Sequence, residues 1–289
     1  MFSSFVIKYN EETIQNLNQL NVENLMKLIY WNTKNNNSLD CIIDILEDYD
    51  PDFLFLSEID EVLLEKGNTD LNRIDFEYYD NPGCDRVKIV KKKSLKCNLN
   101  YQTKYYTTIY LPILDLHIVS VHLPSQMFQH QNALKCFIRD VRNEIDSKIG
   151  NSNLKNIIII GDFNVNPFEP ALIEFDGFGA TNSTNFRRKI SHLSTNSEKI
   201  LYYNPTWKLY EKNHFPGSKY FARPSGSSFD ILEHHLLDQV LISRNLLFNI
   251  ESEKIDFIVH SKKNIFFDNL KNKILISDHL PLSFEFELK

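Results

Sequence analysis

The chain has 289 residues, more than most single domains but within the range of large layered α/β domains. Its 42% hydrophobic and 12% aromatic residues can build a sizeable core, while a net charge of −6 gives no global basic excess. Proteins that bind nucleic acid without sequence preference neutralise phosphates with Lys and Arg. Any nucleic-acid contact here must therefore use a local basic patch or a bound cation.

The four cysteines are scattered, and none belongs to a C-x-x-C pair. This pattern argues against a thiolate zinc site and favours free thiols in a reducing compartment, with a Cys84–Cys97 disulfide as the alternative. The chain has no apolar run near the ~20 residues of a membrane span and no signal-peptide pattern. We therefore expect a cytoplasmic protein without membrane insertion, and a monomer.

The first half of the chain begins with a polar stretch and continues as strand, helix and strand. Residues 1–25 form an N-terminal extension, which we expect to pack on a domain of residues 26–289. Residues 26–31 (MKLIYW) and 52–57 (DFLFLS) are short apolar runs typical of buried strands. Between them, apolar residues from 39 to 46 recur at helical spacing. This order predicts a parallel strand pair with a right-handed crossover.

The rest of the chain continues the alternation of strands and helices. The apolar pattern predicts strands at residues 85–91, 105–111, 115–121, 237–243, 255–259 and 282–288, and a long helix at 131–149. Residues 156–160 (NIIII) have no polar face, as expected for a strand inside a layered sheet. Residues 181–197 and 215–228 are interpreted as surface loops. The whole pattern favours two facing sheets with helices outside.

Polar side chains repeatedly stand where these apolar strands begin or end. The residues concerned are Asn32, Glu58, His122, Asp162, Asn164, Asp238, Asp278 and His279. A single carboxylate or histidine of this kind is more often a loop cap or a structural residue. The complete set at one edge of a packed sheet supplies the oxygen ligands and imidazoles that a hard cation and a phosphate need.

The segments around these residues resemble the endonuclease/exonuclease/phosphatase (deoxyribonuclease I-like) superfamily. They are Trp31-Asn32, Glu58, residues 122–125 (HLPS), 161–164 (GDFN), 204–207 (NPTW), 237–243 (LDQVLIS) and 277–282 (SDHLPL). The resemblance spans nearly the whole chain. It implies an α/β fold, namely a four-layered α/β sandwich of two facing mixed β-sheets flanked by helices, with the active site at one edge of the sheets.

The resemblance also implies a metal site. Glu58 would be the main Mg²⁺ ligand, helped by Asn32, and Asp278 would complete the acidic cluster; Mn²⁺ may substitute. Two residues depart from the pattern. Lys34 stands where some nucleases of the superfamily carry an acidic residue, which favours a single cation. Ser57 stands where glutamine is common, which should change hydrogen bonding around the ligand without abolishing metal binding.

Five residues have implied catalytic roles. Asp162 and Asn164 would hold the attacking water and a phosphate oxygen. His279 would contact the phosphate and be oriented by Asp238, and His122 would donate to the phosphate or the leaving group. A histidine held by a carboxylate is useful near neutral pH because its unperturbed pKa is ~6.5. Whether Asp162 or His279 accepts the proton of the water stays open.

Substrate contacts are less defined. Lysines at 88, 91, 92, 93 and 96 lie close in sequence to Tyr101, Tyr105 and Tyr106. They would form either a platform for single-stranded nucleic acid or, as we favour, a solvated hairpin edge protected by lysines. Arg223 is a candidate phosphate ligand. His234 and His235 cannot both face one site if extended, so neither is assigned as a ligand.

The sequence thus predicts a Mg²⁺-dependent phosphoesterase, most simply a nuclease that hydrolyses phosphodiester bonds by in-line attack of an activated water. Its substrate would be a nucleic acid or a nucleotide. The first alternative is a phosphatase or phospholipase-like (sphingomyelinase-type) hydrolase acting on a small or lipid phosphate ester. The second is a binding or scaffold domain without activity, which the presence of Glu58, Asp162 and His279 disfavours.

Overall fold

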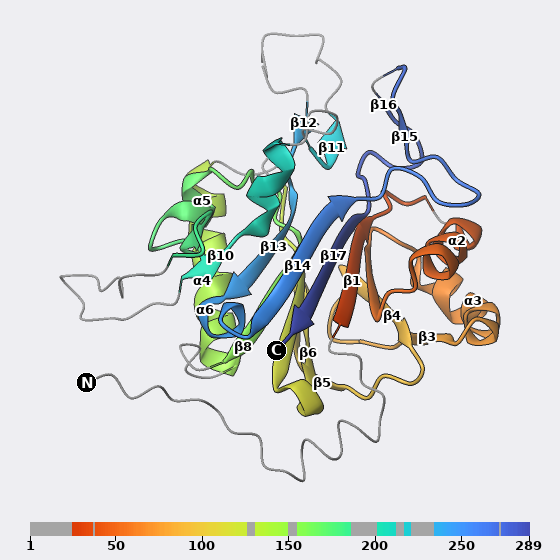
Figure 1. Ribbon diagram of the computed structural model, residues 1–289, viewed down its shortest axis with the longest axis horizontal. Helices are drawn as coiled ribbons and strands as arrows, with labels where there is room; N and C mark the ends of the chain where they lie inside the picture. Colours follow the sequence, from red (N-terminus) through yellow and green to blue (C-terminus); the bar gives the residue numbers. More distant parts are fainter. Residues whose placement is uncertain are drawn as a thin grey trace.

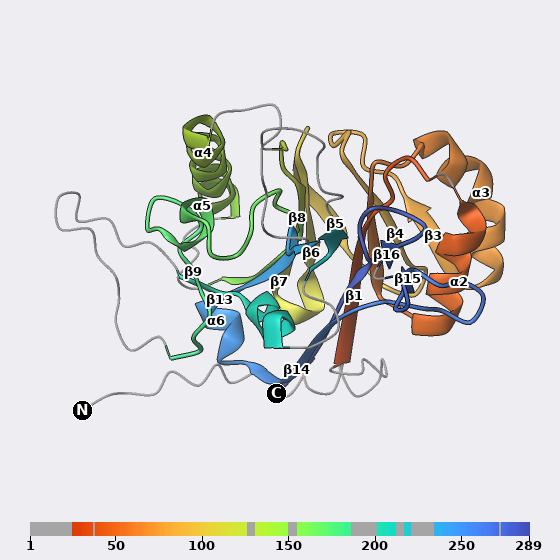
Figure 2. The same ribbon diagram turned by 90° about the horizontal axis from the view of Figure 1, so that it is seen from above.

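The computed structural model describes residues 25–36, 38–125, 131–149, 155–185, 201–211, 217–220, 234–271 and 273–289. Two β-sheets face each other at its centre (Figures 1 and 2). Helices α2 and α3 cover the outer face of one sheet, and α4 and α5 cover the outer face of the other, as Figure 2 shows from above. The predicted four-layered α/β sandwich is confirmed.

The first sheet has six strands in the order β14-β17-β1-β2-β4-β3. Their bounds are β1 Leu25–Asn32, β2 Phe53–Ser57, β3 Phe76–Tyr79, β4 Val87–Lys92, β14 Ile250–Phe257 and β17 Leu282–Leu288. Strands β1 and β2 are parallel, with Asn32 beside Ser57, as the strand–helix–strand pattern predicts. Two helices pack on this sheet, α2 Leu39–Tyr49 and α3 Glu61–Arg73.

The second sheet has seven strands in the order β5-β6-β7-β8-β13-β10-β9. Their bounds are β5 Asn98–Thr103, β6 Tyr106–Leu111, β7 Leu116–His122, β8 Asn156–Asp162, β9 Ala180–Thr181, β10 Tyr202–Tyr203 and β13 Asp238–Ser243. The helical segments beside it are η1 Pro112–Leu114, α4 Gln131–Ile149, α5 Pro170–Ile173, η4 Pro205–Glu211 and α6 Arg244–Leu247. Two small hairpins complete the described part: β11 Lys219–Tyr220 with β12 His234–His235, and β15 Phe267–Asp268 with β16 Lys273–Ile274.

The all-isoleucine strand β8 is buried on both faces, as expected. Ile157 and Ile159 belong to the cluster that includes the apolar face of α4. Ile158 and Ile160 belong to the cluster shared with the six-stranded sheet. Because side chains alternate along a strand, one run of isoleucines fills both layers of the core.

The elements with strong apolar periodicity lie where the sequence predicts them. Helix α4 has the predicted bounds, and α2 begins after the N-cap Ser38, whose side chain accepts a hydrogen bond from the backbone N–H of Cys41. Helix α3 has no counterpart among the predicted elements. Its buried residues are only Leu64, Gly67 and Leu71, so its sequence carries a weak apolar stripe.

The interpretation of the lysine-rich segment as a solvated edge is wrong for two of its residues. Lys88 and Lys91 lie on β4, an interior strand between β2 and β3, and both are buried. Each ammonium pairs with a carboxylate, Lys88 with Glu61 at 2.7 Å and Lys91 with Glu77 at 2.6 Å. The lysine stems thus cover apolar surface while the charges are neutralised.

The described residues bear on several other predictions, and some predictions fall outside them. All four cysteines are free thiols, as expected. No helix in the described ranges is long and apolar enough to span a bilayer. Residues 217–220, predicted as surface loop, instead form β11 and its lead-in, and Ser218 is fully buried there. The N-terminal stretch before residue 25, most of the segment 181–197 and Arg223 lie outside the described residues.

Candidate active site

Strand register brings the predicted residues to one edge of the two sheets. In the seven-stranded sheet Asp162 ends β8, with His122 of β7 beside it on one side and Asp238 of β13 on the other. In the six-stranded sheet Asn32 ends β1 beside Ser57, and Glu58 follows directly. The polar residues at the strand ends therefore meet, as the sequence predicts.

Asn32 joins the two sheets through its side chain. Its Nδ2 donates to Glu58 Oε1 at 3.1 Å and to Asp162 Oδ2 at 3.2 Å. Its Oδ1 accepts from the backbone N–H of Lys34 at 3.0 Å. Asn32 is buried, so its bonds are shielded from water and fix the separation of the two carboxylates.

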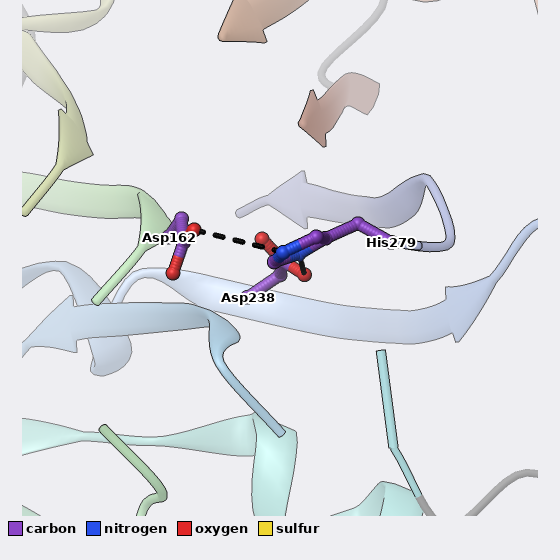
Figure 3. A group of neighbouring side chains, drawn as sticks. All are labelled: Asp162, Asp238 and His279. Atoms are coloured by element: carbon purple, nitrogen blue, oxygen red, sulfur yellow. Dashed lines mark hydrogen bonds and ion pairs between the residues drawn. The ribbon is translucent and has the colours of Figure 1, made fainter. Parts of the chain in front are cut away.

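His279 and Asp238 form a buried pair (Figure 3). His279 Nδ1 donates to Asp238 Oδ2 at 2.7 Å, and His279 Nε2 lies 3.9 Å from Asp162 Oδ2. Burial lowers the pKa of His279, but the charge and hydrogen bond of Asp238, with the charge of Asp162, outweigh it and raise the pKa to about 9. The imidazolium form of His279 is therefore favoured at neutral pH.

Asp162 is surrounded by donors. The backbone N–H of Asn164 donates to Asp162 Oδ1 at 2.8 Å, and His122 Nε2 lies 3.8 Å from Oδ2. Burial raises the pKa of Asp162, although the charges of His279 and His122 oppose this shift. Burial lowers the pKa of His122, against the charges of Asp162 and Glu58. Asp162 therefore binds a proton more readily than a carboxylate in water. His122 stays neutral more readily than His279, whose pKa is raised.

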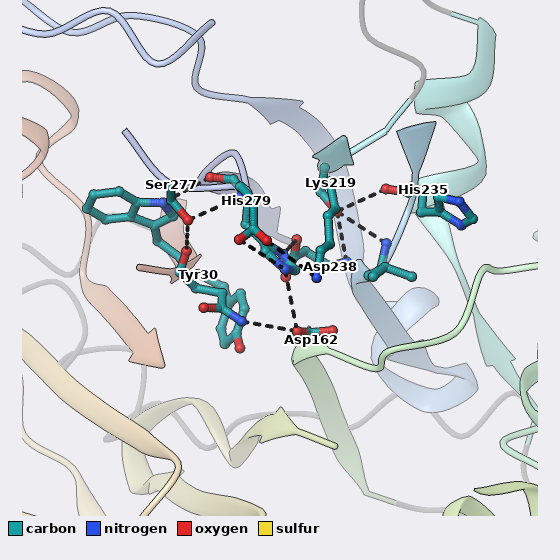
Figure 4. A network of polar contacts seen from close by, with 12 residues as sticks. Tyr30, Asp162, Lys219, His235, Asp238, Ser277 and His279 are labelled. Atoms are coloured by element: carbon teal, nitrogen blue, oxygen red, sulfur yellow. Dashed lines mark hydrogen bonds and ion pairs between the residues drawn. The ribbon is translucent and has the colours of Figure 1, made fainter. Parts of the chain in front are cut away.

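The loop before β17 is anchored by three hydrogen bonds. Ser277 Oγ donates to the backbone carbonyl of Asn32 at 2.7 Å and accepts from the backbone N–H of His279 at 3.1 Å. Trp31 Nε1 donates to the carbonyl of His279 at 3.2 Å. Figure 4 shows this network of polar contacts around His279. The packing of Trp31 and the hydroxyl of Ser277 therefore set the backbone position of His279.

Sequence reasoning missed the contribution of β11. Lys219 pairs through its backbone with His279, and its side chain enters the pocket beside it (Figure 4). The preceding Ser218 uses its Oγ to accept from the backbone N–H groups of Leu237 at 3.2 Å and Asp238 at 3.1 Å. A short strand in a stretch rich in Gly, Pro and Ser gives no periodicity, so the sequence held no signal for it.

Glu58 and Asn32 are the residues best suited to hold a hard cation. Glu58 lines the pocket with its side chain 37% exposed, so its carboxylate can reach both water and a ligand. One carboxylate with an amide oxygen and several waters is a set that suits Mg²⁺. Asp162, Asp238 and His279 could also hold a metal ion by their spacing. There, however, the hydrogen bond between His279 and Asp238 already occupies two of the ligand atoms.

Asp278 lies at the margin of this group. Its Oδ2 is 2.6 Å from Lys34 Nζ and 3.5 Å from Lys219 Nζ. Its Oδ1 is 4.0 Å from His279 Nε2. Lys34, one of the two departures noted in the sequence, therefore places its positive charge on Asp278.

The loops that carry these groups adopt unusual backbone conformations. Lys34, Asn35, Glu58 and Asn164 have φ of 50°, 58°, 51° and 55°, in the left-handed region that non-glycine residues seldom occupy. Backbone strain of the left-handed kind clusters at functional sites.

The sequence departure at Ser57 is accommodated by a hydrogen bond, because its Oγ pairs with the hydroxyl of Tyr30 at 2.7 Å.

A pocket of about 510 Å³ opens over the cluster. Glu58, His122, Asp162, Asn164, Lys219 and His279 line one part of it, and Asn35, Asp85, Arg86 and Lys88 are among the residues that line the rest. This volume falls in the usual range for small-molecule sites and exceeds what a single phosphate group fills. The sequence did not single out Arg86.

Comparison with known proteins gives similarity at the level of structure. No protein-family model matches the sequence, and no curated protein sequence is significantly similar to it. D. rerio TDP2 in complex with a single-strand DNA product is a similar solved structure, with a TM-score of 0.55, 14% identity and coverage of 91% of this chain and 99% of that chain.

Two further solved structures are similar over most of the chain. An AP endonuclease from Archaeoglobus fulgidus has a TM-score of 0.55 at 13% identity, with 91% of this chain and 100% of that chain covered. The human Nocturnin catalytic domain with bound sulfate has a TM-score of 0.53 at 14% identity, with 93% and 96% covered. The chain therefore shares the fold of these three structures, a four-layered α/β sandwich.

Proposed function

We propose that the protein is a Mg²⁺-dependent phosphoesterase that hydrolyses phosphodiester bonds, acting as a nuclease. The observation that carries this proposal is the position of Asp162. Its carboxylate lies within 4 Å of His122, of the His279–Asp238 pair and of Asn32, which in turn holds Glu58. A base, two imidazoles and a cation-binding carboxylate around one pocket are the parts that phosphoester hydrolysis needs.

The proposed roles follow from the contacts. Mg²⁺ held by Glu58 and Asn32 would polarise a non-bridging phosphate oxygen and stabilise the leaving oxygen. Asp162 takes the proton of the attacking water, because it is buried and its carboxylate is fixed by Asn32 and by the backbone of Asn164. His279 stays protonated beside two carboxylates and stabilises the charge on the phosphate.

The other groups complete the site. His122 donates to the phosphate or to the leaving group from β7, on the side of Asp162 opposite to Asp238. Asn164 contributes its backbone N–H to Asp162, and its Nδ2 donates to the carbonyl of Leu123 at 2.8 Å. Together with Asp162 it would hold the attacking water and a phosphate oxygen. Arg223 remains a proposed phosphate ligand that lies outside the described residues.

Two similar structures support nucleic acid as the substrate. One is a TDP2 with a single-strand DNA product, and another is an AP endonuclease. The free thiols support a reducing compartment, so we also propose a cytoplasmic location. A monomeric state stays a prediction.

The test is hydrolysis of bis-p-nitrophenyl phosphate, plasmid DNA, single-stranded DNA and RNA with Mg²⁺ or Mn²⁺ against EDTA. Wild type is compared with Asp162→Ala and His279→Ala, and with Asp70→Ala on the exposed face of α3 as a control outside the pocket. We expect metal-dependent cleavage that falls by about 100-fold or more in both site variants, since general acid–base groups contribute 10²–10⁴-fold. The control should match wild type.

The other outcomes discriminate among the alternatives. Cleavage of bis-p-nitrophenyl phosphate without cleavage of any polymer would favour a small or lipid phosphate ester as the substrate. Activity unaffected by both site variants would refute the assignment of the site. No activity, together with no Mg²⁺ or Mn²⁺ binding in isothermal titration, would favour a scaffold domain.

A further inference from the structure

Arg86 is a cation of the pocket that forms no ion pair with a carboxylate of the described residues. The other two basic residues on the pocket wall are paired, Lys88 with Glu61 and Lys219 with Asp278. Arg86 is partly exposed and directly precedes β4. In a protein whose net charge is −6, an unneutralised guanidinium on a pocket wall is a specific attraction for an anion.

The guanidinium of Arg86 is held by an aromatic ring. It lies 4.9 Å from the ring centroid of Tyr105, and the ammonium of Lys104 lies 5.8 Å from the same centroid. Tyr105 is itself fixed by an edge-on contact with Phe137 of α4, at 4.8 Å between centroids. Stacking on an aromatic face leaves the planar N–H groups of an arginine available for hydrogen bonds.

The backbone before Arg86 is also fixed. Gly83 N–H donates to Gln102 Oε1 at 2.6 Å, and Cys84 Sγ contacts the carbonyl of Lys104 at 3.8 Å. Asn81 Nδ2 donates to the carbonyl of Val87 at 2.8 Å and closes the turn. These bonds tie the Arg86 loop to the β5–β6 hairpin, so the side chain is preorganised and loses little freedom when it binds a ligand.

The same hairpin is connected to the catalytic cluster. The backbone N–H of His122 donates to the carbonyl of Tyr105 at 2.8 Å. Tyr105, whose ring supports Arg86, is therefore hydrogen-bonded to His122, the last residue of β7. Arg86 is fixed relative to His122, and its positive charge helps to lower the pKa of that histidine. It forms no ion pair with Glu58 or Asp162 among the described contacts, so its guanidinium is not engaged by the carboxylates of the cluster.

We propose that Arg86 binds a second phosphate of a nucleic-acid strand, adjacent to the phosphate that is hydrolysed. This assignment rests on the proposed nuclease function. It concerns a phosphate other than the one that is hydrolysed. The scissile phosphate already faces His122, His279 and the cation-binding Glu58, whereas the pocket has room for more than one phosphate group. A guanidinium donates two parallel hydrogen bonds to a phosphate, which suits the non-bridging oxygens of a neighbouring linkage.

The experiment compares Arg86→Met on two substrates. Bis-p-nitrophenyl phosphate has a single phosphate. In a short single-stranded oligonucleotide that is cleaved at one linkage, further phosphates flank the phosphate that reacts. We expect kcat/KM on the oligonucleotide to fall about 10- to 100-fold, mainly through KM, as for a hydrogen bond to a charged group. Activity on bis-p-nitrophenyl phosphate should not change. Arg73→Met, on the exposed face of α3, is the matched control and should behave as wild type on both.

A neutral methylphosphonate placed at each neighbouring linkage in turn locates the contact. At one of these linkages, the methylphosphonate should reduce the kcat/KM of the wild type by the same factor as Arg86→Met does. Combining that methylphosphonate with Arg86→Met should produce no further loss. Equal loss on both substrates would place Arg86 at the scissile phosphate and overturn the proposal, as would no loss on either.

A binding measurement separates this proposal from the proposed function. In EDTA, the Kd of a fluorescent single-stranded oligonucleotide should rise about 10-fold in Arg86→Met and not in Arg73→Met. If wild type hydrolyses nothing but shows this difference, the nuclease assignment fails while the phosphate contact stands. If the Kd is unchanged, the contact is refuted whether or not the protein is a nuclease.

Discussion

At the scale of single residues, the site depends on side chains that position other side chains. Asp238 is fully buried, and its Oδ2 accepts from His279 Nδ1 at 2.7 Å. Its charge is a main reason why the pKa of His279 stays high despite burial. We interpret Asp238 as a positioning residue that holds the ring and its proton, since the atom that faces Asp162 is Nε2.

Replacing Asp238 by Asn tests this role. The amide preserves the shape but removes the charge, so kcat should fall about 100-fold or more while KM changes little. The pKa of His279, measured by NMR titration, should fall from the value of about 9 because the carboxylate that favours the imidazolium is gone. A loss of kcat with an unchanged His279 pKa would show that Asp238 acts only by packing.

Lys34 allows a prediction about the number of cations. Its ammonium lies 2.6 Å from Asp278 Oδ2, where a second cation could otherwise use that carboxylate. We expect isothermal titration with Mn²⁺ to give one site in wild type and a second, weaker site in Lys34→Asp. Lys34→Met, which removes the charge without adding a ligand, is the control and should keep one site. Two sites in wild type would contradict the single-cation interpretation.

At the scale of elements, strand β8 requires a glycine next to Asp162, its last residue. Gly161 has φ of 151°, and a Cβ at this position would lie 2.0 Å from the carbonyl oxygen of Val121 on β7. Because Gly161 immediately precedes Asp162, the close approach of β7 and β8 also sets the distance between His122 and Asp162. The glycine of the GDFN segment is therefore explained by sterics.

Gly161→Ala should consequently destabilise the protein by about 3 kcal/mol or more, since both overpacking and a strained backbone contribute. Gly67→Ala on α3 is a matched comparison, because there the new methyl group would meet the end of the flexible Leu39 side chain. The difference between the two variants is measured by urea unfolding. Equal stability of both would mean that β7 and β8 can separate freely.

Helix α2 anchors a distant loop through one buried carboxylate. Asp44 Oδ2 accepts from Ser261 Oγ, from Asn264 Nδ2 at 2.7 Å and from the backbone N–H of Lys263 at 3.2 Å. Burial raises the pKa of Asp44, but these hydrogen bonds outweigh it and lower the pKa below its ordinary value. The loop after β14 is thereby fixed against the outer layer of the sandwich.

Asp44→Asn should lower the free energy of unfolding by about 1–2 kcal/mol at pH 7, since hydrogen bonds to a charged group are replaced by neutral ones. A carboxyl group with a lowered folded-state pKa stabilises the protein above its unfolded pKa, and this contribution disappears as the pH falls through the folded value. Urea unfolding of wild type and variant should therefore converge below about pH 4. A constant difference across this range would rule out a role for the charge.

The sequence predicted the elements whose apolar patterns are strong. The stripe of α4 has the expected bounds, and the strand predicted at 156–160 is found as β8, which continues two residues further to Asp162. Helix α3 was not predictable because its exposed face dominates its composition, and β11 was not because two residues cannot show a period. The burial of Lys88 depends on its pairing with Glu61 on α3, a contact that exists only after the missed helix has packed.

The candidate site was predictable to the extent that its residues directly adjoin strong strands. Asn32, His122 and Asp162 are such residues, and strand register alone brings them together. Arg86 and Lys219 enter the same pocket from a loop and a short hairpin. Their positions depend on tertiary contacts, such as the Tyr105 ring under Arg86, that no local pattern encodes.

At the scale of the whole molecule, the two sheets share one apolar core. Phe55 and Leu56 of the six-stranded sheet belong to the same buried cluster as Ile158, Ile160 and Val240 of the seven-stranded sheet. The pocket lies at the edge of this core, with Asn32 donating to Asp162 across the two sheets. Neither sheet can keep its inner face buried alone, so separation of the sheets would disrupt the core and the site together.

We therefore expect residues 26–289 to unfold as one cooperative unit, although proteins of this size often populate intermediates. Trp31 is buried in β1 of the six-stranded sheet, and Trp207 lies in η4, where Thr206 Oγ1 accepts from Val240 of the seven-stranded sheet. Trp207→Phe leaves Trp31 as the reporter for the six-stranded sheet. Trp31→Phe leaves Trp207 as the reporter for η4, which also pairs with β14 of the six-stranded sheet through Lys208 and Glu253. Within each variant, guanidinium unfolding followed by tryptophan fluorescence and by far-UV circular dichroism should give coincident transitions. A fluorescence transition that precedes the circular-dichroism one in either variant would show that the structure around the remaining tryptophan unfolds separately, and the site could then be lost before the rest of the fold.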